Sequence, residues 1–95
     1  MNQVVLSARI AQASALRYTP AGLPALDLRL EHESQIVEAG QERQVNVEVK
    51  AVAFGTLAET IGKQAIGSPW KFTGFLATPR NGKHSVLHIQ SFVQD

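Results

Sequence analysis

The sequence predicts an all-β barrel of five strands with one short helix. Five segments alternate apolar and polar residues with a period of two, which is typical of strands that bury one face. One segment after the third of them repeats apolar residues at helical spacing instead. The chain has 95 residues and neither an internal repeat nor a low-complexity tail. We therefore expect a single domain over residues 1–95.

The first three strands show this alternation clearly. We expect them near residues 4–10, from about Ala25 to Ser34, and from near Gln44 onward. The residues predicted to point inward are Val4, Leu6, Ala8, Ile10, Leu26, Leu28, Leu30, His32, Val45, Val47 and Val49. Because His32 lies on an apolar face, it is expected to be a hydrogen-bonded core residue and not a metal ligand.

Two connecting segments separate these strands. Residues 14–24 form the first, and Thr19-Pro20-Ala21-Gly22 fits a type I turn with proline at its second position and glycine at its fourth. Residues 35–43 are polar and contain Gly40, so this segment is expected to be a loop.

A short helix is predicted after the third strand. Thr56 and Glu59 have the spacing of a capping box, in which each side chain bonds a backbone N–H at the start of the helix. An apolar stripe follows at helical spacing, made of Leu57, Ala58, Ile61 and Ala65. Gly62 costs about 1 kcal/mol inside a helix, so the helix is expected to end there.

The last two strands are expected at about Trp70–Thr78 and Val86–Val93. Alternation places Trp70 and Phe72 in the core and Phe75 on the outside. On the last strand, an outward face is predicted for Val86, His88 and Phe92. Asn81-Gly82 between these strands is the strongest short hairpin signal, because both central residues of a type I′ turn need positive φ.

Five strands with a helix between the third and fourth is the order of a Greek-key OB-fold barrel. An SH3-like barrel is the alternative topology, and the position of the helix argues against it. Closure of the sheet into a barrel explains why each strand has one continuous apolar face.

The composition limits the classes of function. Nine basic and eight acidic residues give a formal charge of +1, so nucleic-acid binding would depend on local clusters of charge. The absence of cysteine excludes disulfides and thiolate chemistry. Met1-Asn2-Gln3 does not begin a signal peptide, and no apolar stretch approaches the ~18 residues of a membrane span. We therefore expect a cytoplasmic protein with no membrane partner.

No set of residues predicts catalysis or a metal site. Glu31 and Glu33 are about 7 Å apart on one strand face, which permits a carboxylate pair, but a solvated charged face is the favoured interpretation. His84 and His88 have H-x3-H spacing, yet four strand residues span about 13 Å, too far to share a metal. Neither a nucleophile–base pair nor a phosphate-binding glycine loop is present, so the expectation is a non-enzyme without cofactor or metal.

Nucleic-acid binding is the function that the predicted fold favours. OB-folds bind oligonucleotides across their second and third strands and through the flanking loops. Basic residues lie near these places in the sequence: Arg17, Arg43, Lys50, Arg80 and Lys83. Stacking platforms for bases are few; the candidates are Tyr18 and Phe75.

Several segments also resemble known families. KAVAFGTLAE followed by WKFTGFL resembles the bacterial single-stranded-DNA-binding protein family. VVLSARI, YTPAGLPALDLRLEHES, EAGQERQ, PRNGK and SVLHIQSF are similar to the primosomal replication protein N (PriB) family, a relative of those proteins. This resemblance covers essentially the whole chain. It implies an OB-fold homodimer that binds single-stranded DNA and helps the helicase PriA restart stalled replication forks, with DnaT as a further partner where it exists.

The resemblance carries over unevenly to individual residues. Arg17, Arg80 and Lys83 match basic loop positions of the family's DNA surface. Gln41 and Asn46 stand where better-known members have aromatic residues, which adds Asn46 to the candidate nucleic-acid-binding residues. Glu33 stands at a basic position. These departures imply a weaker hold on DNA and keep open the alternative of a protein-interaction OB module with weak residual DNA binding.

Overall fold

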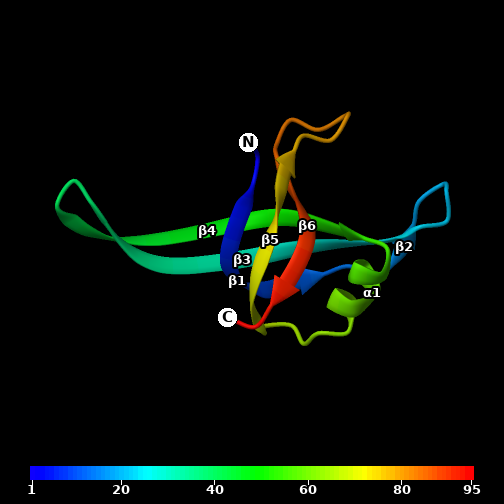
Figure 1. Cartoon of the computed structure of the whole chain (residues 1–95), viewed down its shortest axis with the longest axis horizontal. Coiled ribbons are helices and arrows are strands. Elements are labelled where there is room, and N and C mark those ends of the chain that lie inside the picture. Colours follow the sequence, from blue (N-terminus) through cyan, green and yellow to red (C-terminus); the bar gives the residue numbers. More distant parts are fainter.

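A single β-sheet runs through the chain and bends back on itself (Figure 1). The computed structural model describes all 95 residues, from Met1 to Asp95. Its elements in chain order are β1 (Val4–Ala13), β2 (Arg17–Tyr18), β3 (Pro24–Glu38), β4 (Gln41–Phe54), α1 (Thr56–Gly62), β5 (Pro69–Ala77) and β6 (Val86–Val93). The sheet order is β1-β5-β6-β4-β3-β2, and β1 also pairs with β3.

The double pairing of β1 closes the barrel. Residues 4–9 of β1 pair with β5, and residues 9–13 pair with β3 across a bulge between Ile10 and Gln12. On the opposite side, β4 and β6 pair in parallel at Ala51↔Leu87 and Val52↔His88. The five long strands form the predicted OB-fold barrel, with α1 between the third and fourth of them. The two-residue strand β2 is an addition that the sequence did not predict.

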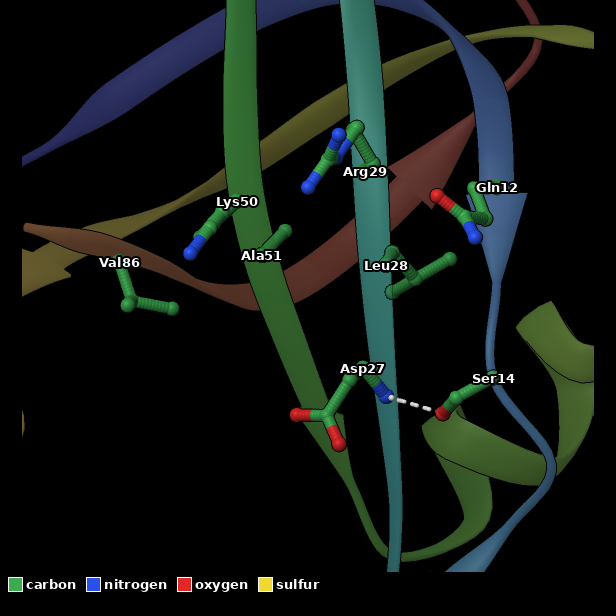
Figure 2. A pocket seen from close by; sticks show the side chains of 8 residues that line it. All are labelled: Gln12, Ser14, Asp27, Leu28, Arg29, Lys50, Ala51 and Val86. Carbon is green, nitrogen blue, oxygen red and sulfur yellow. Dashed lines mark hydrogen bonds between the residues drawn. The ribbon is translucent and has the colours of Figure 1, made fainter.

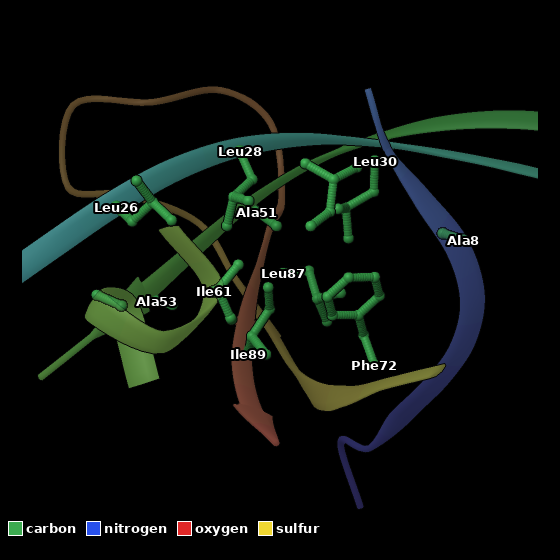
Figure 3. Close-up of a cluster of buried hydrophobic side chains, with 12 residues drawn as sticks. Ala8, Leu26, Leu28, Leu30, Ala51, Ala53, Ile61, Phe72, Leu87 and Ile89 are labelled. Carbon is green, nitrogen blue, oxygen red and sulfur yellow. The ribbon is translucent and has the colours of Figure 1, made fainter. Parts of the chain in front are cut away.

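The core fills the barrel with the side chains that the alternation predicts (Figure 3). The largest fully buried side chains come from five elements: Phe72, Ile10, Leu26, Leu30, Ile61 and Leu87. Ile61 and Ala58 bring one side of α1 into this cluster. The helix therefore packs against the core, and it lacks the length and apolar character that a membrane crossing requires.

The two longest strands continue beyond the barrel as a two-stranded ribbon, which we call the arm (residues 32–47). It extends the molecule to 50 Å along its longest axis. The predicted loop at 35–43 is wrong, because β3 and β4 pair up to Glu38↔Gln41. Only Ala39 and Gly40 form the turn, with φ of 53° and 79°. The segment is polar because both faces of the arm are exposed there, and Val47 is accordingly 42% exposed instead of buried.

His32 joins the base of the arm to β1. Its Nδ1 lies 2.6 Å from the backbone carbonyl of Ser7, and its Nε2 lies 2.8 Å from the hydroxyl of Ser34. A carbonyl can only accept, so Nδ1 carries a proton and donates to Ser7, and in the neutral ring Nε2 then accepts from the Ser34 hydroxyl. This half-buried histidine is hydrogen-bonded, as predicted.

The start of α1 differs from the predicted capping box. Gly55 is the N-cap, with φ of 74°, and no side chain caps the helix. The N–H groups of Ala58 and Glu59 donate to the Gly55 carbonyl at 3.0 and 3.4 Å. Thr56 is thus already helical, one position too late to cap. The predicted end at Gly62 is confirmed, and Ala65 lies exposed beyond it.

The connection between β5 and β6 also differs from the prediction. Neither Asn81 nor Gly82 has positive φ, so they do not form a type I′ hairpin. The Gly82 N–H instead donates to the Pro79 carbonyl at 2.9 Å within a loop over residues 78–85. A loop of this length can join the strands without a two-residue turn.

A bulge in β6 reverses the direction of Phe92. Ile89 pairs with Gly74 and Ser91 pairs with Thr73, which leaves Gln90 as an extra residue. Phe92 therefore turns toward the core and meets Trp70 edge to face, with ring centroids 4.9 Å apart. Its predicted place on the outer surface is wrong.

Candidate nucleic-acid interface

The outside of the barrel carries three rows of side chains that cross neighbouring strands, because paired residues point to the same side of a sheet. We call this surface the outer face. One row joins Arg17, Ala25 and Phe54. The next crosses four strands through Asp27, Val52, His88 and Phe75. The third pairs Arg29 with Lys50. Basic, acidic and aromatic groups therefore share one surface.

Three rings on the outer face form an aromatic cluster. Phe75 stacks on His88 with ring centroids 4.9 Å apart and an interplanar angle of 17°. Phe54 lies 5.9 Å from His88 and is 37% exposed. Partly exposed rings of this kind can stack on nucleic-acid bases. The outward directions predicted for Phe75 and His88 are confirmed. Sequence reasoning did not identify His88 or Phe54 as stacking candidates, because only the strand pairings bring them to Phe75.

An open groove of about 360 Å³ lies beside this cluster (Figure 2). It runs over β3 and β4 between the end of β1 and the start of β6. Its lining residues are Gln12, Ser14, Asp27, Leu28, Arg29, Lys50, Ala51 and Val86. Val86 directly follows the loop that carries Arg80 and Lys83, so this loop ends at the edge of the groove.

Most arginines are neutralised within the chain. Four of the five form ion pairs with carboxylates: Arg9–Glu31 at 3.1 Å, Arg17–Asp27 at 2.7 Å, Arg29–Glu48 at 2.9 Å, and Arg43–Glu38. The basic residues without an ion pair are Lys50, Lys63, Lys71, Arg80 and Lys83. Of the five predicted cations, three are therefore free to meet a phosphate and two are held.

Arg17 and Asp27 form the best-defined of these pairs. Arg17 Nε donates to Asp27 Oδ2 at 2.7 Å, and Arg17 Nη2 donates to Oδ1 at 3.0 Å. This bidentate hydrogen bonding lowers the pKa of Asp27 and raises that of Arg17. Tyr18, next to Arg17 on β2, is 66% exposed and available for stacking.

The remaining predicted residues, Arg43 and Asn46, lie apart from this groove on the arm. Asn46 points to the same side as Lys50, whereas Arg43 pairs with Ile36 on the opposite face of the arm. Residues 31–48 contain five of the eight acidic residues and only one basic residue, Arg43. The structure thus brings Lys50 and Asp27 together at the groove but does not bring Arg43 and Asn46 to it.

Comparison with known proteins agrees with this geometry. Residues 2–91 match the model of a family described as "Another single-strand binding protein family". The chain is 47% identical to replication restart protein PriB of Bordetella pertussis over 91 residues, which are 95% of this chain and 85% of that protein. The chain belongs to the PriB group of this single-strand binding family.

Solved structures place this family member in the same fold. PriB from Ralstonia solanacearum superposes with a TM-score of 0.89 at 33% identity, covering 99% of this chain and 97% of that one. The single-stranded DNA binding protein of Thermus aquaticus gives a TM-score of 0.79 at 27% identity, covering 98% of this chain and 49% of that one. The predicted resemblance and OB-fold are confirmed.

Proposed function

We propose that this chain binds single-stranded DNA on its outer face as a replication restart protein. The aromatic cluster beside unpaired cations carries the proposal. Bases would stack on Phe54, His88 and Phe75, and Lys50 would meet the phosphates. Val52 is the strand partner of His88, and Lys50 is two residues from Val52. The Cα atoms of Lys50 and His88 are therefore within about 10 Å of each other. The relatives' name, replication restart protein, supports the cellular role.

Arg80 and Lys83 complete the proposed phosphate contacts from the loop at residues 78–85. Both are exposed and neither forms an ion pair. This assignment changes the predicted binding set: Lys50, Arg80, Lys83 and Tyr18 stay in it, Phe54, His88 and Phe75 join it, and Arg43 and Asn46 leave it. Arg17 lies on the outer face but is held by Asp27.

A salt titration tests this function. Fluorescence anisotropy with labelled oligothymidine should give a slope of log K against log salt near −2, because three single-strand phosphate contacts contribute about −0.7 each. Lys50→Ala, Arg80→Ala and Lys83→Ala should each weaken binding and flatten the slope by under one unit. Lys63→Ala is the matched control, since Lys63 is an exposed, unpaired cation that directly follows α1. The proposal is contradicted if the affinity does not change with salt concentration, or if Lys63→Ala lowers the affinity as much as the other three substitutions do.

The second candidate function is a protein-interaction module with weak DNA binding. The acidic arm and the self-neutralised arginines favour it, because both reduce attraction for phosphate. The proposed partners are the helicase PriA and, where the organism has it, DnaT. Calorimetry of this chain with PriA, in the presence and absence of oligothymidine, separates the two functions: the module would bind PriA strongly and DNA weakly.

We further propose a homodimeric, non-catalytic, cytoplasmic protein in which residues 1–95 form one OB-fold domain. The edge of β1 at residues 4–8 that faces away from β5 has no strand partner, and Val5 on it is 57% exposed. A small barrel gains stability by covering such an apolar edge with a second copy. Sedimentation showing only a ~10 kDa monomer at micromolar concentration would contradict the dimer.

A further inference from the structure

The guanidinium of Arg17 already binds an anionic group of the protein itself, the carboxylate of Asp27. Its Nε and Nη2 hold both oxygens of Asp27 at 2.7 and 3.0 Å. The same two guanidinium nitrogens can bind two oxygens of a phosphate in the same bidentate way. A carboxylate in that place mimics the ligand, so a DNA phosphate has to compete with it.

Asp27 is the fixed member of the pair. It lies within β3, between β4 and the end of β1, and its backbone is anchored on both sides. The Asp27 N–H donates to Ser14 Oγ at 3.2 Å, and the Asp27 carbonyl accepts from the Ser14 N–H at 2.9 Å. Arg17, in contrast, extends from the two-residue strand β2 on a long side chain. A competing phosphate would therefore move Arg17 and leave the carboxylate in place.

Asp27 also lies within the proposed DNA path. It lines the groove together with Arg29 and Lys50 (Figure 2). It shares a row of the outer face with His88 and Phe75. Its side chain is 50% exposed, so a DNA backbone in the groove would meet this negative charge.

We propose that Asp27 is an internal competitor of the DNA phosphate, which withholds Arg17 from the DNA and thereby sets the affinity of the outer face. This inference rests on the proposed single-stranded-DNA binding and assigns to that site a determinant of its strength. In the wild-type protein, Arg17 releases few counterions on binding, because its charge is already neutralised. Removal of the carboxylate adds one phosphate contact without adding a basic residue.

A double-mutant cycle of Asp27→Asn and Arg17→Ala tests the proposal with labelled oligothymidine over a range of salt. Asp27→Asn should tighten binding on the order of tenfold, as one charge-assisted contact would, and steepen the salt slope by about 0.7. Arg17→Ala alone should weaken binding, because it leaves the charge of Asp27 unpaired in the groove, and in the Asp27→Asn background it should remove the whole gain. Glu59→Gln makes the same change in net charge on α1 and should leave binding unchanged.

Two results would overturn the inference while leaving the proposed function standing. One is a wild-type affinity and salt slope for Asp27→Asn; the other is a double variant, Asp27→Asn with Arg17→Ala, that keeps the whole gain of Asp27→Asn. Absence of DNA binding in the wild type and all variants would reject both proposals together. Thermal melts of each variant identify any loss of affinity that comes from unfolding.

Discussion

Gly74 on β5 lies directly against the backbone carbonyl of His88 on β6. A Cβ added at Gly74 would overlap the carbonyl oxygen and lie 2.9 Å from the carbonyl carbon. The contact occurs at the bulge of β6, where the register between the two strands shifts between Thr73 and Gly74. The glycine therefore fixes the position of His88, and with it the aromatic cluster of the outer face.

Gly74→Ala should destabilise the fold by about 1–3 kcal/mol, since a backbone atom cannot rotate away from the new methyl group. Urea unfolding should show a lower midpoint with an unchanged m-value. Gly62→Ala is the control, because its Cβ would meet only a side chain of Leu26 at 3.8 Å and the change favours helix by up to about 1 kcal/mol. Equal stability of both variants would show that β5 and β6 separate at little cost.

Ile61→Asp should unfold the domain, because Ile61 is 1% exposed and an unpaired buried charge costs several kcal/mol. Leu57→Asp should act in the same direction, since Leu57 packs against the core. Circular dichroism melts provide the measurement. Ala65→Asp should stay within about 0.5 kcal/mol of the wild type, as Ala65 is exposed beyond the helix. An Ile61→Asp protein that melts normally would mean that α1 is not packed on the core.

Ala39→Asn should stabilise the arm by up to about 1 kcal/mol. Ala39 has φ of 53°, a conformation that asparagine tolerates better than alanine, and Asn-Gly is the preferred pair of a type I′ turn. Amide hydrogen exchange should slow on the arm more than in the barrel. Gly40→Ala, which forces alanine to a φ of 79°, should have the opposite effect. Faster exchange in Ala39→Asn would argue against this turn.

Phe75→Ala should weaken single-stranded-DNA binding by about 1–3 kcal/mol, the contribution of one stacked base. The salt slope should stay unchanged, because no charge is lost. Ile66→Ala removes an even more exposed apolar side chain, 61% exposed, from the loop after α1 and should have no effect. A Phe75→Ala protein with normal affinity would exclude the aromatic cluster from the binding surface.

Periodicity predicted the barrel well because burial inside it is one-sided. Leu26, Leu28 and Leu30 alternate with charged residues, and all three are buried. The same reasoning failed at Phe92, where one extra residue at Gln90 shifts the pattern by one position. No local feature of the sequence marks that bulge, since it depends on how β6 fits against β5.

Local turn signals were less reliable because the length of a connection overrides them. Asn81-Gly82 has strong type I′ preference, yet its loop is long enough to adopt another form. Ala39-Gly40 has a weaker preference and forms the tight turn, because the pairing of β3 and β4 leaves only two residues to connect them.

Of the candidate site, only the unpaired basic residues could be predicted from the sequence. Lys50, Arg80 and Lys83 could be placed from the order of strands and loops. The ion pairs that neutralise Arg17 and Arg43 join residues 10 and 5 positions away, and the pairing of the strands determines them. The stacked pair of Phe75 and His88 likewise requires the register between β5 and β6.

The arm has a consequence for how separate molecules meet. Both of its long edges lack a strand partner, and such edges are where molecules add to one another and aggregate. Ile36 and Val37, which are 54% and 67% exposed, would strengthen that tendency. The glutamates along the arm oppose it, because two copies laid edge to edge would bring like charges together. We therefore expect the acidity that reduces the attraction of the arm for phosphate also to oppose edge-to-edge association of the protein at high concentration.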